Sequence, residues 1–152
     1  KPKLYKDFIN LVDAELSKRH PESYEIIGML WVQGETDSNT SNGPTAADSY
    51  QENLENLINS VRGHYNSADL PFLLLGVGSK KVQNAMVTVS NKLTNVTFIE
   101  RSQDLNKSNY TPIYTHKWKG KPVGHYNYEG MKKIGQLFFE NYLDNYLNSI
   151  HQ

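Results

Sequence analysis

Three short apolar runs constrain the fold of this chain more than any other feature. They lie at residues 24–32, 71–77 and 95–100. An uninterrupted run such as Phe72-Leu73-Leu74-Leu75 is typical of a strand in a parallel sheet that helices cover on both faces. We therefore predict that each run forms a strand buried on both of its faces.

Helical patterns separate the three runs. Residues 4–18 and 128–150 have apolar side chains spaced three and four apart, and residues 81–92 show the same pattern more weakly. Asn127 is the predicted N-cap of the last helix. The clearest pattern lies in residues 46–62, where one helix face carries Ala47, Tyr50, Leu54, Leu57, Ile58 and Val61.

The resulting order is helix, strand, helix, strand, helix, strand, loop, helix. This alternation predicts an α/β layered fold with right-handed crossovers, and 152 residues fit one domain. Residues 101–127 have no strong period, so we predict a long loop there. Loops that only connect two elements are usually much shorter, so this loop is expected to have a function.

Charge and composition exclude several classes of function. Sixteen basic residues balance sixteen acidic ones without a long block of either sign, so we expect neither nucleic acid nor a membrane as a partner. No apolar run approaches the ~20 residues of a membrane span. The absence of cysteine excludes disulfides, thiolate metal sites and thiol catalysis. It leaves the compartment open, and a secreted or periplasmic location is the favoured expectation.

Two polar clusters indicate a site. Gln33-Gly34-Glu35-Thr36-Asp37-Ser38 follows the first apolar run, at the edge where ligands bind in open parallel sheets, although turn formation alone also explains it. His125 precedes the last helix. An amide that donates to an oxyanion and an imidazole that takes a proton from a hydroxyl suggest acyl transfer. No cofactor is implied, and no metal site, since His125 has no second histidine at ligand spacing.

Four stretches of the chain are informative together: GMLWVQGETDS, AADSYQENLENLINSVRGHY, DLPFLLLGVG and HYNYEGMKKIGQLFFENYL. They resemble the SGNH hydrolases of the sialate O-acetylesterase and acetylxylan esterase type, a group of carbohydrate esterases. The resemblance implies a flavodoxin-like three-layer α/β/α fold with a parallel sheet, of which residues 1–152 would be the C-terminal portion of a single domain. It also implies removal of acetyl groups from sialic acid or from plant or algal polysaccharides.

The same resemblance assigns roles to three residues. Gln33 corresponds to the family residue whose side-chain amide helps to form the oxyanion hole. Glu35 corresponds to the acid of the same motif, which we interpret as a group that orients the site. His125 corresponds to the catalytic histidine before the last helix.

The family's nucleophilic serine has no counterpart here. It lies in a GQSN-like block after the first strand of the family fold, and neither that block nor the glycine-rich second block occurs in this chain. Ser38 and Ser79 occupy positions where the family has no nucleophile. We therefore hypothesise a companion N-terminal segment or chain that supplies the first strands and the serine.

The acid that orients the catalytic histidine is also missing from its usual place. SGNH enzymes carry an aspartate three residues before the histidine, and here that position is Pro122. Either the triad is reduced to a dyad, with a backbone carbonyl orienting the ring, or another acid reaches the imidazole. Asp104 and Glu35 are the candidate acids.

The sequence says less about the substrate than about the reaction. Aromatic side chains that could stack on a sugar crowd residues 110–128, and the binding candidates are Trp31 and Tyr126. The expected partner is an acetylated carbohydrate. Two alternatives remain open: a catalytically inactive relative that binds glycans, and an SGNH esterase that acts on another acyl ester.

Overall fold

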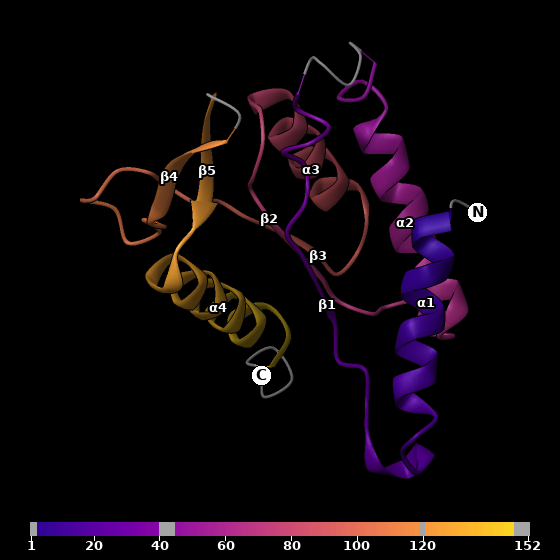
Figure 1. Ribbon diagram of the computed structural model, residues 1–152. Coiled ribbons are helices and arrows are strands. Elements are labelled where there is room, and N and C mark those ends of the chain that lie inside the picture. The colour runs from indigo at the N-terminus through magenta and orange to yellow at the C-terminus, as the bar shows by residue number, and fades with distance from the viewer. Residues whose placement is uncertain (1–2, 40–44, 119–120, 148–152) are drawn as a thin grey trace.

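The computed structural model describes residues 3–39, 45–118 and 121–147. Its elements follow one another as a mixed α/β chain (Figure 1). The helices are α1 (Lys3–Leu16), α2 (Tyr50–His64), α3 (Lys80–Lys92) and α4 (Tyr128–Tyr142), with a 3-10 turn at Pro21–Ser23 and a π-helical turn at Leu143–Leu147. The strands are β1 (Met29–Trp31), β2 (Phe72–Leu75), β3 (Val96–Ile99), β4 (Ile113–Trp118) and β5 (Lys121–Tyr126).

A parallel three-stranded sheet in the order β1-β2-β3 forms the centre of the molecule. Met29 pairs with Phe72, and Phe72 pairs with Val96. In Figure 1, α4 lies on one face of the sheet, while α1, α2 and α3 lie on the other. This arrangement confirms the predicted layered α/β/α fold with a parallel sheet, and all four helical patterns are confirmed as helices.

The core gathers around β2. All four residues of this strand are fully buried, and they pack with Ile58 of α2 and Met86 of α3 in one apolar cluster. The continuous apolar sequence of residues 72–75 thus reflects a strand covered on both faces, as predicted. No helix among the described residues is long and apolar enough to cross a membrane.

The first strand differs from the prediction. The apolar run at residues 24–32 was expected to be a strand buried on both faces, but β1 covers only Met29–Trp31. Leu30 is 56% exposed, on a strand that pairs on one side with β2 and has no partner on its other side among the described residues. The prediction was wrong about burial because it assumed neighbours on both sides of the strand.

The predicted loop at residues 101–127 contains a hairpin. Strands β4 and β5 pair antiparallel, with Ile113 opposite Tyr126 and Tyr114 opposite His125. The sequence mixes polar, charged and aromatic residues on both strands, so it lacks the apolar run that marks a buried strand. Backbone pairing between the two strands defines this element, and the loop prediction was wrong for residues 113–118 and 121–126.

A buried arginine secures the amino end of the sheet. Arg62, at the end of α2, is only 8% exposed. Its Nε and Nη2 atoms donate to Leu70 O at 3.1 and 2.9 Å, and Nη2 also donates to Thr94 O at 2.7 Å. Both carbonyls lie just before a strand, so one side chain ties β2 to β3 where the strands begin. Burial lowers the pKa of Arg62 from its usual value, but the guanidinium stays charged in the neutral range.

Candidate active site

The polar loop after β1 depends on a glycine. Gly34 has φ +145°, and a Cβ there would lie 2.8 Å from Val82 Cγ1 of α3. Both the backbone conformation and the close approach of α3 therefore favour glycine. The loop turns sharply over the carboxyl end of the sheet as a result.

The loop is fixed to the end of β2 by Ser38. Its hydroxyl donates to Gly34 O at 2.6 Å and accepts from Ser79 N at 2.6 Å. Gly78 lies so close, at φ +78°, that a Cβ there would stand 2.3 Å from Ser38 Oγ. Ser79 in turn caps α3 by accepting from Val82 N. Both hydroxyls are thus part of the loop's framework, consistent with excluding these serines as nucleophiles.

Gln33 is held on both sides. Its Nε2 atom donates to Asp37 Oδ2 at 2.5 Å, and its backbone carbonyl accepts from the Tyr50 hydroxyl at 2.7 Å. Trp31 Nε1 donates to the same hydroxyl at 3.1 Å. Burial raises the pKa of Tyr50 to about 12, so the hydroxyl keeps the proton that it donates. These hydrogen bonds fix the side-chain amide of Gln33, and one of its two Nε2 hydrogens has no acceptor among the described residues.

A hollow of about 580 Å³ opens beside Gln33, on the side of the sheet that carries α1 and α2. Trp31 and Tyr50 line it together with the amides of Asn53 and Asn56. The indole of Trp31, one of the predicted binding residues, therefore lies in this hollow. A largely apolar wall with a few amides is a common composition for a ligand site.

Glu35 lies near enough to two tyrosines to act on them electrostatically. Its negative charge raises the pKa of Tyr50 and also that of Tyr126, although burial is the main cause for both tyrosines. Arg101 acts on Tyr126 in the opposite direction, and its guanidinium carbon lies 5.6 Å from the centre of the Tyr126 ring. Glu35, Tyr126 and Arg101 therefore share one region at the carboxyl end of the sheet.

His125 is an exposed residue near the end of β5, next in sequence to Tyr126. Asn127 follows and caps α4, because its side chain accepts from Gly130 N at 2.8 Å, as predicted. The cap fixes the chain direction just after the histidine. Pro122 lies on the same strand, but its side chain is outside the described part of the structure, as are those of Tyr114 and Trp118.

The candidate acid Asp104 makes local contacts. Its Oδ1 atom accepts from Asn106 N at 3.0 Å and from Asn106 Nδ2 at 3.2 Å, in an exposed turn after β3. Hydrogen bonds through Tyr50 bring Gln33 and Trp31 together, while Asp104 is engaged in its own turn.

Sequence reasoning missed two residues of this region. Tyr50 was assigned to the apolar face of a helix, and nothing in its position indicates that its hydroxyl supports Gln33. Arg101 was not assigned any role. The available signal was its position, since a basic residue directly after a buried strand lies at the ligand-binding edge of the sheet.

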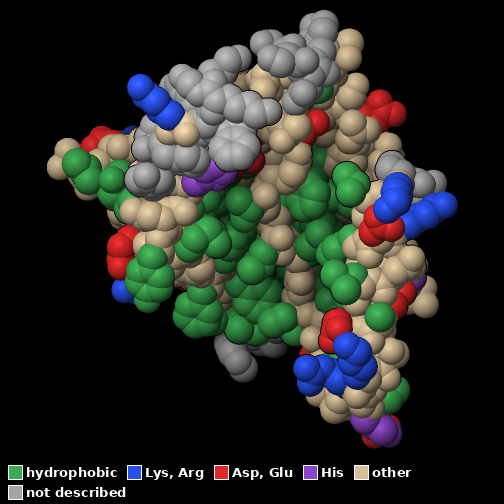
Figure 2. Space-filling view, viewed as in Figure 1, with side chains coloured by type: hydrophobic (Ala, Val, Ile, Leu, Met, Phe, Trp, Pro, Cys, Tyr) green, Lys and Arg blue, Asp and Glu red, His purple; other side chains and the backbone are tan. Residues whose placement is uncertain are grey.

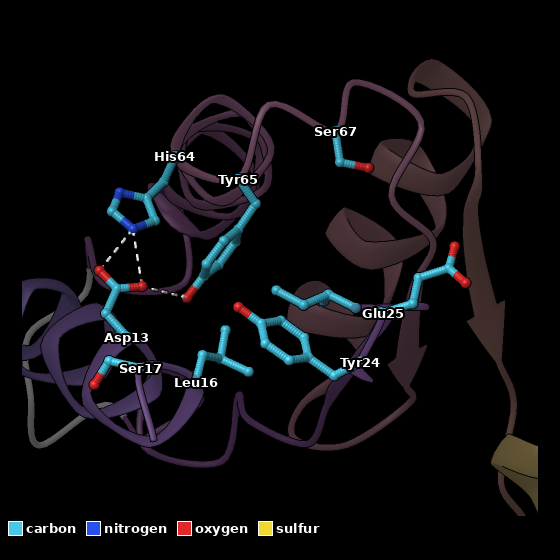
Figure 3. Close-up of a pocket in the computed structure, with 9 residues that line it drawn as sticks. Asp13, Leu16, Ser17, Tyr24, Glu25, His64, Tyr65 and Ser67 are labelled. Carbon is cyan, nitrogen blue, oxygen red and sulfur yellow. Dashed lines mark hydrogen bonds and ion pairs between the residues drawn. The ribbon is translucent and has the colours of Figure 1, made fainter. Parts of the chain in front are cut away.

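A second hollow, also of about 580 Å³, lies at the opposite end of β1, between the ends of α1 and α2. Figure 3 shows Asp13, His64 and Tyr65 pointing toward one another there. His64 Nε2 lies 2.9 Å from Asp13 Oδ2, and the Tyr65 hydroxyl donates to Asp13 Oδ1 at 3.2 Å. The contact between Asp13 and His64 joins α1 to α2 at the end of the sheet opposite to the Gln33 loop.

Comparison with known proteins identifies relatives of the chain. The model of a family of carbohydrate esterases, described as sialic acid-specific acetylesterases, matches residues 1–144. A solved structure of an Arabidopsis thaliana protein is similar with a TM-score of 0.69 and 25% sequence identity. The similarity covers 95% of this chain and 53% of that protein, so the chain spans about half its length. No curated protein is significantly similar in sequence.

Proposed function

Because the chain belongs to the sialic acid-specific acetylesterase family of carbohydrate esterases, we propose that it forms the oxyanion hole and supplies the general base of a serine-dependent carbohydrate O-acetylesterase. The observation that carries this proposal is the fixed amide of Gln33. Asp37 holds its Nε2 atom and Tyr50 holds its backbone carbonyl, at the edge of the sheet where a ligand is expected. Such rigidity is what an oxyanion hole requires, because donors oriented in advance need no reorganisation during reaction.

The proposed reaction has two halves. A serine hydroxyl attacks the acetyl carbonyl carbon while His125 takes its proton, and the Gln33 N–H donates to the resulting oxyanion. The tetrahedral intermediate collapses, the sugar hydroxyl leaves with the proton from the imidazolium, and an acetyl-serine remains. Water then attacks this ester, again with His125 as the base, and acetate and free serine are formed.

Glu35 is the acid to test first as the group that orients His125. Its carboxylate belongs to the loop that follows β1, at the edge of the sheet where a ligand is expected, whereas Asp104 is engaged by Asn106 in its own turn. A dyad, in which a backbone carbonyl orients the ring, is the competing arrangement. Replacing Glu35 and Asp104 separately by their amides distinguishes them, since a loss of several orders in kcat at one position identifies the acid, and small losses at both indicate the dyad.

The serine is proposed to come from a companion segment that pairs with β1. Met29 N donates to Pro71 O of the chain leading into β2, so the backbone groups of the next residue, Leu30, point to the other edge. An unpaired edge of this kind is a template for a further strand. A parallel strand added here would end beside the loop of Gln33, which is where the serine is needed.

Exposed apolar side chains on both layers fit the same segment. Leu4 and Leu11 of α1 are 82% and 65% exposed on one side of the sheet, and Met131 and Phe139 of α4 are 57% and 63% exposed on the other. Figure 2 shows hydrophobic side chains gathered over α4, over α1 and along the strip between them. Surfaces of this kind mark interaction sites. They would cover the two faces of an added strand and pack against its helix.

Acetate release tests the proposed function. We expect the full-length protein to release acetate from 9-O-acetyl-N-acetylneuraminic acid, and the isolated chain of 152 residues to release none. Activity of the isolated chain as a folded monomer would contradict the companion segment. Sugar binding by the full-length protein without acetate release would favour the inactive glycan-binding relative.

The strand-pairing step has its own test. Leu30→Pro removes the N–H that points to the free edge, while Leu30→Ala removes the same side chain and keeps that N–H. If a strand pairs here, the proline variant loses assembly with the companion segment and the alanine variant keeps it. Equal behaviour of the two variants would place the companion elsewhere.

A further inference from the structure

Asp37 is a half-buried acid in the loop that follows β1. An aspartate in such a loop commonly accepts hydrogen bonds from backbone N–H groups of its own turn. Here Ser38 closes the turn, because its backbone N–H and its hydroxyl both donate to Gly34 O, at 3.0 and 2.6 Å. The carboxylate of Asp37 is therefore not what forms the turn.

The hydrogen bond that the described structure gives Asp37 goes to the side chain of Gln33. Asp37 Oδ2 accepts from Gln33 Nε2 at 2.5 Å. An ionised carboxylate accepts hydrogen bonds and donates none, whereas a side-chain amide has a donor end, the NH2 group, and an acceptor end, the oxygen. Only the donor end of the Gln33 amide can therefore face Asp37. The reversed amide would place Oε1 against a negatively charged oxygen.

The backbone contact of Gln33 does not fix the direction of its amide. Tyr50 donates to Gln33 O at 2.7 Å and holds the main chain, but the side-chain torsion angles of Gln33 do not depend on that bond. Within the described residues, Asp37 is the hydrogen-bond partner of the amide group itself. The direction of the amide therefore depends on one carboxylate.

The direction of an amide matters because its two ends act oppositely on an oxyanion. An N–H that points to the oxyanion stabilises it, and a carbonyl oxygen in the same place repels it. An amide that rotates between the two orientations has to reorganise during the reaction. The charge of Asp37 also repels a developing negative charge nearby. A carboxylate at this position favours the reaction only if the fixed direction of the amide outweighs this repulsion.

We propose that Asp37 is a positioning residue for the acyl transfer. It binds one N–H of the Gln33 amide, so that the second N–H, and not Oε1, is presented to the oxyanion. The inference rests on the proposed function for the role of Gln33 and adds to it the residue that sets the direction of the amide. Asp37 contacts neither the substrate nor the serine and acts through Gln33 alone.

A double-variant cycle tests whether Asp37 acts through Gln33. In the full-length protein, with p-nitrophenyl acetate as the substrate, Asp37→Ala should lower kcat by about 10-fold with little change in KM. This loss is a part of the roughly 10²–10³-fold loss that follows removal of a whole oxyanion donor. In the Gln33→Ala background, Asp37→Ala should lower kcat no further. An equal loss in both backgrounds, or a higher kcat in Asp37→Ala than in the wild type, overturns the inference.

Asp37→Asn separates the direction of the amide from the charge. The new side chain accepts through Oδ1 or donates through Nδ2, so it permits both orientations of the Gln33 amide and carries no charge. Its kcat should lie between those of the wild type and Asp37→Ala, whereas a kcat above the wild type would show that repulsion dominates and would contradict the proposal. Asp48→Ala is the matched control. It removes an exposed carboxylate that pairs with Lys81 and should leave kcat unchanged.

Nuclear magnetic resonance separates this inference from the esterase proposal. In the isotope-labelled full-length protein, the side-chain NH2 signals of Gln33 are identified by their loss in Gln33→Ala. The proton bound to Asp37 should lie downfield of ordinary side-chain amide protons, because its acceptor is charged. Asp37→Ala should return it to the ordinary range, and Asp48→Ala should not. An ordinary chemical shift in the wild type overturns the inference. A shifted signal in a protein without esterase activity would mean that the proposed function fails while Asp37 still orients the amide.

Discussion

The two ends of the parallel sheet use half-buried and buried polar side chains in opposite ways. At the amino end, Arg62 Nε and Nη2 donate to the carbonyls that precede β2 and β3. At the carboxyl end, Gln33 Nε2 makes one hydrogen bond, and Arg101 Nε makes none among the described residues. The donors of Arg62 are used to hold the strands together, whereas the Gln33 amide keeps a hydrogen for the proposed reaction.

The largest expected effect is on kcat, and it should distinguish the two histidines that lie near opposite ends of the sheet. If the proposed esterase reaction holds, His125→Ala in the full-length protein should lower kcat by about 10²–10⁴, because loss of the general base leaves the serine hydroxyl unactivated. His64→Ala is the matched control at the amino end. It removes the contact with Asp13, should lower the melting temperature slightly and should leave kcat unchanged. Equal losses of kcat in the two variants would contradict the comparison.

Gln33→Ala should lower kcat by about 10²–10³ with little change in KM, since the amide acts on charge that develops in the transition state. Gln83→Ala supplies a control amide at the same end. Its Nε2 atom donates to Gly78 O at 3.0 Å, so that its loss affects stability alone. If Gln33→Ala changed only the stability of the protein, Gln33 would belong with the structural donors.

Arg62→Met should lower the free energy of unfolding by about 3 kcal/mol, because it leaves the buried carbonyl of Leu70 without a donor and also removes the hydrogen bond to Thr94 O. Arg101→Met removes a guanidinium that donates no Nε hydrogen bond and should change the free energy of unfolding by less than about 1 kcal/mol. Urea denaturation of both variants measures the difference. A large loss for Arg101→Met would show that this arginine is structural.

The smallest effect concerns Tyr50, whose pKa burial raises to about 12. An acid whose pKa is higher in the folded than in the unfolded protein stabilises the fold fully below pH 10, and that contribution is lost as the pH rises toward 12. The free energy of unfolding of Tyr50→Phe should therefore fall less steeply than that of the wild type between pH 10 and 12. Urea denaturation at each pH measures this difference. If the free energy of unfolding changed with pH equally in wild type and variant, the pKa of Tyr50 would not be raised by burial.

Regular periodicity made most of the fold predictable. The residues of β2 form one apolar run because helices cover both faces, and the helix patterns at residues 46–62 and 128–150 follow from burial of one face. Residues 148–150 lie outside the described part of the chain. The hairpin strands at residues 113–118 and 121–126 were missed since their sequence contains no apolar run to detect. The exposure of β1 was missed because a single sequence does not show which strands lie side by side.

The sequence suggests candidate site residues only where two polar signals support each other. The amide after the first strand also fits a turn, and the histidine before the last helix is what favours a site that includes Gln33 and His125. Tyr50 and Arg101 gave no such indication, since a tyrosine on a helix face usually packs and an arginine after a strand is usually exposed. Their roles depend on which atoms have hydrogen-bond partners, and only the three-dimensional arrangement shows that.

The central claim is that this chain activates a serine that it does not contain. The most direct test treats the full-length protein with a fluorophosphonate, which modifies activated serines, and locates the adduct by mass spectrometry of peptides. We expect one adduct, on a serine outside these 152 residues, and a much slower reaction in the His125→Ala variant. An adduct on Ser38 or Ser79, or an unlabelled protein that still releases acetate, would contradict the claim.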